Sequence, residues 1–268
     1  MRRRSIGWLE LYGLLFIALL YGPMLLLPLF SFNDSLYIAF PFKGFTVKWY
    51  EAMVKDSALL AALRNSLSVA VPVSIVSTAL GLLTAKALTR FRLPGRGAIM
   101  GLIMVPLVIP FIILGIALLT TLRKTFDVPL SLWTVAAGHI LICLPFSVMV
   151  LMSRLEGFDR SLEEASLDLG ESAWSTFWRI TFPIVMPGVV SSLLLCFTAS
   201  FDEFLIAFFL SGDGATLPVF IWSQLRFPQK LPNVLALGSC ILVLSFLLIA
   251  FAEKLRRGGM HTKEHPAF

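Results

Sequence analysis

Six stretches of about twenty residues or more contain no Asp, Glu, Lys or Arg, and this pattern constrains the fold more than any other feature of the chain. The hydrocarbon core of a bilayer is roughly 30 Å thick, so a helix needs about twenty apolar residues to cross it. Because 57% of the 268 residues are hydrophobic and only 14% are charged, too little polar surface exists to cover a soluble core. We therefore predict an all-α integral membrane protein whose six transmembrane helices occupy residues 11–33, 65–85, 97–122, 130–153, 180–201 and 231–252, the fifth extending to about residue 210.

The distribution of Lys and Arg predicts how the chain is oriented in the membrane. Six spans place both termini on one side, and 14 of the 22 Lys and Arg residues lie there: in the N-terminus (Arg2, Arg3 and Arg4), the 86–97 loop, the loop after the fourth span and the C-terminal tail. Lys and Arg are enriched in cytoplasmic loops, so both termini are expected in the cytoplasm, and the first apolar run is expected to be a retained span. The net charge of +6 is then a topology signal and requires no nucleic-acid partner.

A polar segment, residues 157–187, separates the fourth and fifth spans. Ser161 and Glu164 have the spacing of a capping box, which predicts a helix that begins at Ser161 and ends at Gly170. A second helix is expected from Ser172 to about Thr181, before the chain returns to the membrane. Two short helices joined at a glycine would form a knob, with exposed acids and aromatic side chains that suit a groove on a partner protein.

Two adjacent acids, Asp202 and Glu203, lie near the end of the fifth apolar stretch. An Asp in hydrocarbon costs about 2.5–3.5 kcal/mol on insertion scales, so we expect both side chains to face the interior of the bundle. Neighbouring residues of a helix point about 100° apart, so both acids could border one wet cavity that attracts polycations and repels oxyanions. The alternative is an ion pair with Arg64, Lys124 or a second subunit that only fixes the packing.

Other polar or helix-breaking residues occur inside the predicted spans. Pro106 and Pro110 lie four residues apart in the third span and are expected on one helical face, where they predict either a helix that lines a pathway or a kink needed for packing. His139 stands alone in the fourth span and could contact a solute or form a hydrogen bond across a helix interface. The chain contains no glycine-rich phosphate loop or nucleophile elbow, and its three cysteines lack metal-ligand spacing. We therefore expect no catalytic residue, no metal ligand and no cofactor bound by this chain.

The knob also carries a recognisable motif. Its spacing is E-A-A, three residues, G, nine residues, I, one residue, L-P, at Glu164, Ala165, Ser166, Gly170, Ile180 and Pro183. This spacing resembles the cytoplasmic coupling loop in the permease subunits of bacterial ABC importers. Ser166 stands where the family has Ala, and Phe182 stands where it has Leu. Both changes keep the small or apolar character of the position.

The resemblance implies a type I ABC importer permease fold, with residues 1–268 as a single transmembrane permease domain in the bacterial inner membrane. It implies that the motif residues, together with the neighbouring Glu163, couple the spans to a cytosolic ATPase. The implied partners are a second permease subunit in a heterodimer, two copies of the ATPase subunit and an extracytoplasmic solute-binding protein. ATP and Mg²⁺ would be bound by the ATPase subunits.

A second resemblance suggests which solute is carried. The six spans, the basic second loop, the proline-bearing third span, the acidic pair and the segment RLEGFDRSLEEASLDLG look similar to permeases of the spermidine/putrescine type. We therefore expect alternating-access import of a polyamine, with Asp202, Glu203, Pro106, Pro110 and His139 along the pathway. An importer for an opine, an amino-acid derivative or another cation is the alternative. An ion-coupled secondary transporter is a further one, but it leaves the coupling motif unexplained.

Overall fold

The computed structural model describes the backbone of residues 7–258 and the side chains of residues 7–247 except residue 245. Arg2, Arg3, Arg4 and Lys263, which contribute to the predicted orientation, lie outside the described residues. Contacts divide the chain into two compact units. Ala58–Phe220 forms the central unit, and the residues before and after it form the terminal unit.

The terminal unit consists of helices α1, α2 and α12 and the loop between the first two. α1 and α2 both pack against α12. Tyr50 of α2 is hydrogen-bonded through its hydroxyl to Ser31 Oγ at 2.6 Å, and Trp49 donates its indole N–H to the carbonyl of Asn33 at 2.9 Å. These bonds tie α2 to the end of α1. The bounds in this unit are α1 (Trp8–Ser31), α2 (Lys48–Lys55), the 3₁₀ turn η3 (Pro228–Lys230) and α12 (Leu231–Gly258).

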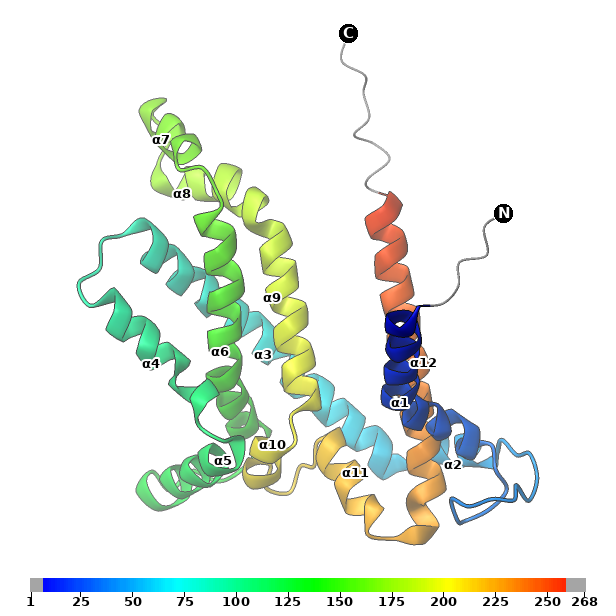
Figure 1. Cartoon of the computed structure of the whole chain (residues 1–268). Coiled ribbons are helices and arrows are strands. Elements are labelled where there is room, and N and C mark those ends of the chain that lie inside the picture. Colours follow the sequence, from blue (N-terminus) through cyan, green and yellow to red (C-terminus); the bar gives the residue numbers. More distant parts are fainter. Residues whose placement is uncertain (1–6, 259–268) are drawn as a thin grey trace, which may run out of the picture. The chain divides into compact units, whose positions relative to one another are not determined.

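The central unit is a bundle in which α6 packs along α9 and also contacts α4 and α10, while α10 packs on α5 (Figure 1). Its α-helices are α3 (Ser57–Arg90), α4 (Arg96–Val108), α5 (Phe111–Thr120), α6 (Leu132–Glu156), α7 (Ser161–Asp168), α8 (Ala173–Thr176), α9 (Phe182–Asp202) and α10 (Leu205–Leu210). Two π turns, η1 (Thr121–Thr125) and η2 (Phe177–Thr181), extend α5 and join α8 to α9. α11 (Leu217–Leu225) begins in this unit and ends in the terminal unit.

A line of buried hydroxyl groups connects three helices of the central unit. Ser192 of α9 donates to Ser147 of α6 at 2.8 Å and is bonded to Thr78 of α3 at 3.0 Å. Gly81 of α3 lies so close to Ser147 that a Cβ at position 81 would overlap its side chain. Small residues and interhelical hydroxyl bonds are the usual means of close helix packing in lipid, where apolar contact alone gives no preference for protein over lipid.

Side-chain contacts place the loops of the central unit at two opposite ends. Arg96 pairs with Glu156 at 3.0 Å, so the 86–97 loop lies beside the end of α6 that leads into the knob. At the other end, Thr134 bonds the carbonyl of Leu210 at 2.8 Å. Figure 1 shows α7 and α8 at one end of this unit and α10 at the other. The predicted second to fifth spans therefore run in alternating directions between these two ends, as an up-and-down membrane bundle requires.

The predicted spans agree with the helices in position but not in every detail. Within residues 7–258, four helices are long and apolar enough to cross a membrane, and α4 with α5 makes a fifth if the pair counts as one span. α12 covers the predicted sixth span. The third span is not one helix, because the chain bends by 100° at Ile109 and Pro110. The prediction that Pro106 and Pro110 share a helical face was therefore wrong, since the helix ends between them.

Candidate functional site

The knob begins with a short helix whose two ends are defined by local hydrogen bonds. α7 begins at Ser161, as predicted, but no capping box forms there. Arg160 is the N-cap residue and forms no side-chain cap, but Oδ1 of Asp159, one residue earlier, accepts the N–H of Ser161 at 3.0 Å and takes the place of a cap. This bond to the charged form of an exposed carboxyl lowers the pKa of Asp159. Ser161 is already the first helical residue, so its hydroxyl cannot serve as the N-cap.

The helix α7 ends in a Schellman motif at Gly170. Gly170 has a φ of +88°, and its N–H bonds the carbonyl of Leu167 at 2.9 Å. The next N–H, of Glu171, reaches back to the carbonyl of Ser166 at 3.2 Å. Only glycine adopts this conformation without strain, which confirms the predicted helix end and the sharp turn at this motif position.

The second helix of the knob does not end where the sequence suggested. It begins after Ser172, whose hydroxyl accepts the N–H of Ser175, and continues without a break through η2 into α9. In the π turn the N–H of Phe182 bonds the carbonyl of Phe177, five residues earlier. Pro183, at the start of α9, has no N–H to donate, and the helix widens in the turn before it instead of stopping. Ala173–Asp202 is thus one 30-residue helix.

The two adjacent acids of the knob line the same hollow but differ in burial and pairing. The Glu163 side chain is 15% exposed and its Oε2 lies 2.7 Å from Nε of Arg90, while its Oε1 accepts the hydroxyl of Thr181 at 2.6 Å. Glu164 and Ala165 are exposed. The hydroxyl of Ser166, at the position where the family has Ala, is buried and bonded to Thr176 at 2.9 Å.

The outer surface of the knob exposes several large apolar side chains among its charged residues. Leu169 and Trp174 are 87% and 72% exposed, the two largest values on the knob's large apolar side chains. Of the remaining motif residues, Pro183 is exposed and Ile180 is half-buried. A patch of this kind on a short rigid helix pair is typical of a surface that is covered by a partner. Its other large apolar members are Leu162, Leu167 and Trp178.

The acidic pair marks a break at the far end of the same helix. α9 ends at Asp202, Glu203 adopts an extended backbone, and α10 begins at Leu205, so the fifth span does not run on to residue 210 as one helix. The Glu203 carboxyl is buried and accepts the N–H groups of Leu205, Ile206 and Ala207 at 2.9, 2.8 and 3.2 Å. It satisfies the free donors of α10 that the break creates.

His139 has a partner that its position in the sequence does not reveal. Its Nδ1 is 2.8 Å from Ser200 Oγ, and its Nε2 is 3.3 Å from Oε2 of Glu203 without the alignment of a hydrogen bond. All three side chains are buried. His139 on α6 therefore forms a hydrogen bond across a helix interface, which is one of the two roles that the sequence suggested.

Asp202, by contrast, borders a cavity. The space has a volume of about 400 Å³, and its walls are mostly aromatic and aliphatic. It is lined by Phe111, Ile142, Phe146, Ala199, Asp202, Glu203, Phe204 and Leu205. Among the residues that line it, the carboxyl of Asp202 is the exposed charge, because Glu203 is turned into the protein. Phe111 follows Pro110 directly, so the broken third span reaches this cavity through its bend.

Comparison with known proteins identifies the family of the chain. Residues 77–258 match the family described as the inner membrane component of binding-protein-dependent transport systems. The chain belongs to this family.

The permease is similar in sequence to several polyamine transport permeases. It is 36% identical to the spermidine/putrescine transport system permease protein PotC of Escherichia coli K12 over 241 residues, which cover 90% of each chain. It is 35% identical to the putrescine transport system permease protein PotI of the same strain over 263 residues, or 93% of each chain. PotC of Haemophilus influenzae is 34% identical over 245 residues, which cover 91% of this chain and 94% of that protein.

Solved structures share the fold of the permease. A chain of a bacterial ABC transporter involved in the import of the acidic polysaccharide alginate aligns with a TM-score of 0.71 at 17% identity, over 93% of this chain and 95% of that one. The bacterial alginate ABC transporter in complex with an alginate pentasaccharide-bound periplasmic protein gives a TM-score of 0.70 at 15% identity, over 93% and 94%. These likenesses confirm an ABC importer permease fold.

Sequence analysis did not identify several residues that contact Glu163 in the knob or His139 near the acidic pair. Arg90 was assigned only to the basic loop, and neither Thr181 nor Ser200 was singled out. They come from segments far apart in the chain, and no spacing within one helix connects them to Glu163 or His139. Within the described part of the permease, no group of three or more His, Cys, Asp or Glu residues lies close enough to hold a metal ion.

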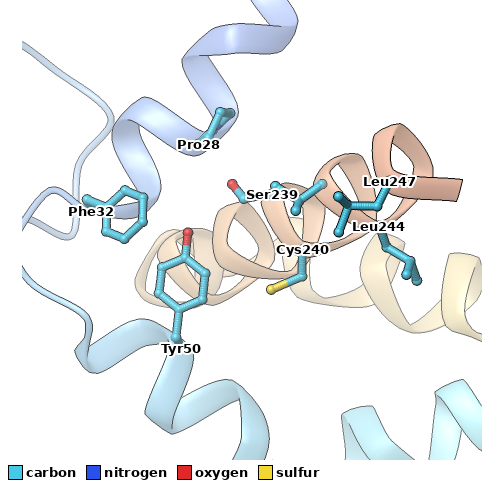
Figure 2. Close-up of a pocket in the computed structure, with 8 residues that line it drawn as sticks. Pro28, Phe32, Tyr50, Ser239, Cys240, Leu244 and Leu247 are labelled. Atoms are coloured by element: carbon cyan, nitrogen blue, oxygen red, sulfur yellow. The ribbon is translucent and has the colours of Figure 1, made fainter. Parts of the chain in front are cut away.

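The terminal unit of the permease has an apolar pocket of its own, with a volume of about 410 Å³. Figure 2 shows Phe32 and Tyr50 on one side of it and Ser239, Cys240 and Leu244 on the other. Pro28, Val243 and Leu247 complete the lining. The residues that line the pocket include no charged side chain.

Proposed function

We propose that the chain is one permease subunit of an ATP-driven importer that carries a polyamine-like cation into the cytoplasm by alternating access. The observation that carries the proposal is Asp202, an exposed carboxyl on the wall of an otherwise apolar and aromatic cavity. Such a wall suits a solute with a cationic amine at the end of a methylene chain, because the charge meets the carboxyl and the chain meets apolar surface. The names of the relatives PotC and PotI support the same class of solute.

The proposed assembly follows from the knob and the family. A cytosolic ATPase subunit would receive the apolar surface around Trp174 and Leu169, with Glu164 and the exposed motif residues at the contact. Two ATPase subunits would bind ATP and Mg²⁺, a second permease would complete the pathway, and a solute-binding protein would deliver the cation from outside. The Arg96–Glu156 contact places the basic 86–97 loop beside the knob, which supports a cytoplasmic position for both.

The proposal is tested by uptake into proteoliposomes that contain the complete importer with its solute-binding protein. We expect ATP-dependent uptake of labelled putrescine or spermidine, and none of an uncharged sugar. Asp202→Asn should reduce polyamine uptake by about tenfold or more, because a hydrogen bond to a charged group is worth roughly 1.5–3 kcal/mol.

The matched control is Asp127→Asn, which removes a carboxyl outside the cavity. Asp127 is exposed and has a φ of +48°, a conformation that Asn adopts readily, so uptake should stay unchanged. Equal uptake by wild type and Asp202→Asn would refute the role of the carboxyl. Uptake without ATP or without the ATPase subunit would refute the importer itself.

A further inference from the structure

A single carboxyl in the knob connects three segments of the central unit. Glu163 on α7 forms an ion pair with Arg90, the last residue of α3, at 2.7 Å, and accepts a hydrogen bond from Thr181 in η2 at 2.6 Å. The Arg90 guanidinium also lies over the ring of Phe158 at 5.2 Å. The connection therefore runs from the end of a membrane span, through the knob helix, to the π turn of the long α8–α9 helix.

A second contact reinforces the same junction. Lys86, one turn before Arg90 on α3, lies over the ring of Phe177 at 4.3 Å. Phe177 and Thr181 are the first and last residues of the π turn η2. The end of α3 thus holds both the knob helix and the turn that leads from the knob back into the membrane.

The Arg90–Glu163 pair differs from the other ion pairs near it in burial. The side chains of Arg90 and Glu163 are 8% and 15% exposed, whereas those of Arg96 and Glu156 are 49% and 51% exposed. Nε and Nη2 of Arg90 are both buried and have no aligned hydrogen-bond partner within the described residues, so the 2.7 Å contact with Oε2 of Glu163 is an ion pair without hydrogen-bond geometry. A half-exposed pair contributes little, but removing one partner of a buried pair leaves a charge without compensation.

We propose that Glu163 is a positioning residue that locks the knob to α3, so that a displacement of the knob is transmitted to the membrane spans. This inference rests on the proposed function, in which an ATPase displaces the knob. Glu164, the next residue, is exposed and lines the same hollow as Glu163, beside Lys86 and Arg90. In this proposal Glu163 transmits the displacement, and the more exposed Glu164 is left for contact with the ATPase. Without the lock, the ATPase still binds and hydrolyses ATP, but the knob turns against α3 instead of moving it.

The test measures solute transported per ATP hydrolysed by the complete importer in proteoliposomes. In Glu163→Gln and in Arg90→Met we expect complex assembly and ATP hydrolysis close to wild type. Transport per ATP should fall by at least about tenfold, because losing one partner of a buried pair shifts a local equilibrium by more than that factor. Glu156→Gln, which breaks the half-exposed pair with Arg96, is the matched control and should keep the wild-type ratio.

Two further measurements keep the inference open to refutation. If Glu163→Gln fails to assemble, Thr181→Val keeps the ion pair and the shape of the side chain but removes the hydroxyl bond, and it should lower transport per ATP about threefold. In the isolated full-length permease, Glu163→Gln should accelerate amide hydrogen exchange in residues 161–168 and leave that of α6 unchanged.

The outcomes separate the inference from the function on which it rests. Uptake and ATP hydrolysis that fall in proportion, or unchanged exchange in residues 161–168, would overturn the lock. A wild-type complex without ATP-dependent uptake would refute the proposed function, while the exchange measurement would still decide whether Glu163 holds the knob. An unchanged transport ratio in Thr181→Val, with the protein fully assembled, would also count against the lock.

Discussion

Removing the side chain of Glu203 should destabilise the protein strongly, because this carboxyl holds the break between α9 and α10 together. Glu203→Ala leaves the N–H groups of Leu205, Ile206 and Ala207 without acceptors, and the last two residues are fully buried. An orphaned buried donor costs about 1–3 kcal/mol, and three neighbouring ones are not additive, so we expect a loss of about 3–5 kcal/mol in the free energy of unfolding. Glu203→Gln retains one acceptor oxygen and should lose about 1–2 kcal/mol.

The assay is equilibrium unfolding of the purified permease in mixed micelles of a mild detergent and dodecyl sulfate. Asp202→Asn is the comparison, because its carboxyl is exposed and lines the cavity, and its free energy of unfolding should change by less than about 0.5 kcal/mol. The two substitutions should therefore have different effects: the one at Glu203 should lower stability, and the one at Asp202 should lower uptake. A Glu203→Ala variant within about 1 kcal/mol of wild type, or equal losses for both variants, would refute the capping role.

Three other predictions concern local backbone geometry. Gly81→Ala should destabilise the bundle by about 1–3 kcal/mol because its Cβ would overlap the facing serine of α6, whereas Gly101→Ala, with open space around it, should be neutral or stabilising in the same unfolding assay. Gly170→Ala places a Cβ at a φ of +88°, which costs about 1–2 kcal/mol, and it should lower ATP-dependent uptake without lowering expression. The lowered pKa of Asp159 means that its hydrogen bond stabilises α7 above the pKa of an unfolded aspartate, and that this stabilisation is lost as the pH falls further. The protection of the α7 amides, corrected for their intrinsic exchange rates, should therefore decrease below about pH 4, and less so in Asp159→Ala.

The sequence could predict most of the spans because lipid imposes a single requirement, a helix about twenty apolar residues long. It could also predict the end of α7, since Gly170 combines the residue type and the position that a left-handed helix end requires. It placed the start of α7 correctly but chose the wrong cap. Asp159 and Ser161 are both good capping residues two positions apart, and spacing alone cannot choose between them.

The partners at the two sites could not be predicted, because they depend on how separate helices meet. The segment around Glu203 contains neither Gly nor Pro, so local preferences favour a continuous helix. The helix breaks there because the Glu203 side chain replaces the lost backbone bonds and gains a contact with His139 on another helix. In the same way, Glu163 was placed among the coupling residues without any sign that it turns inward to Arg90.

The uninterrupted helix Ala173–Asp202 has a consequence for how far a local event can reach. Thirty residues at about 1.5 Å each give a rod roughly 45 Å long, enough to span the hydrocarbon core with one end in the knob and the other at the acidic break. The exposed ring of Trp174 and the carboxyl of Asp202 therefore belong to the same rod. This helix therefore offers a second route, beside the Glu163 contact with α3, by which a tilt of the knob would reach the charge in the cavity without a loop in between.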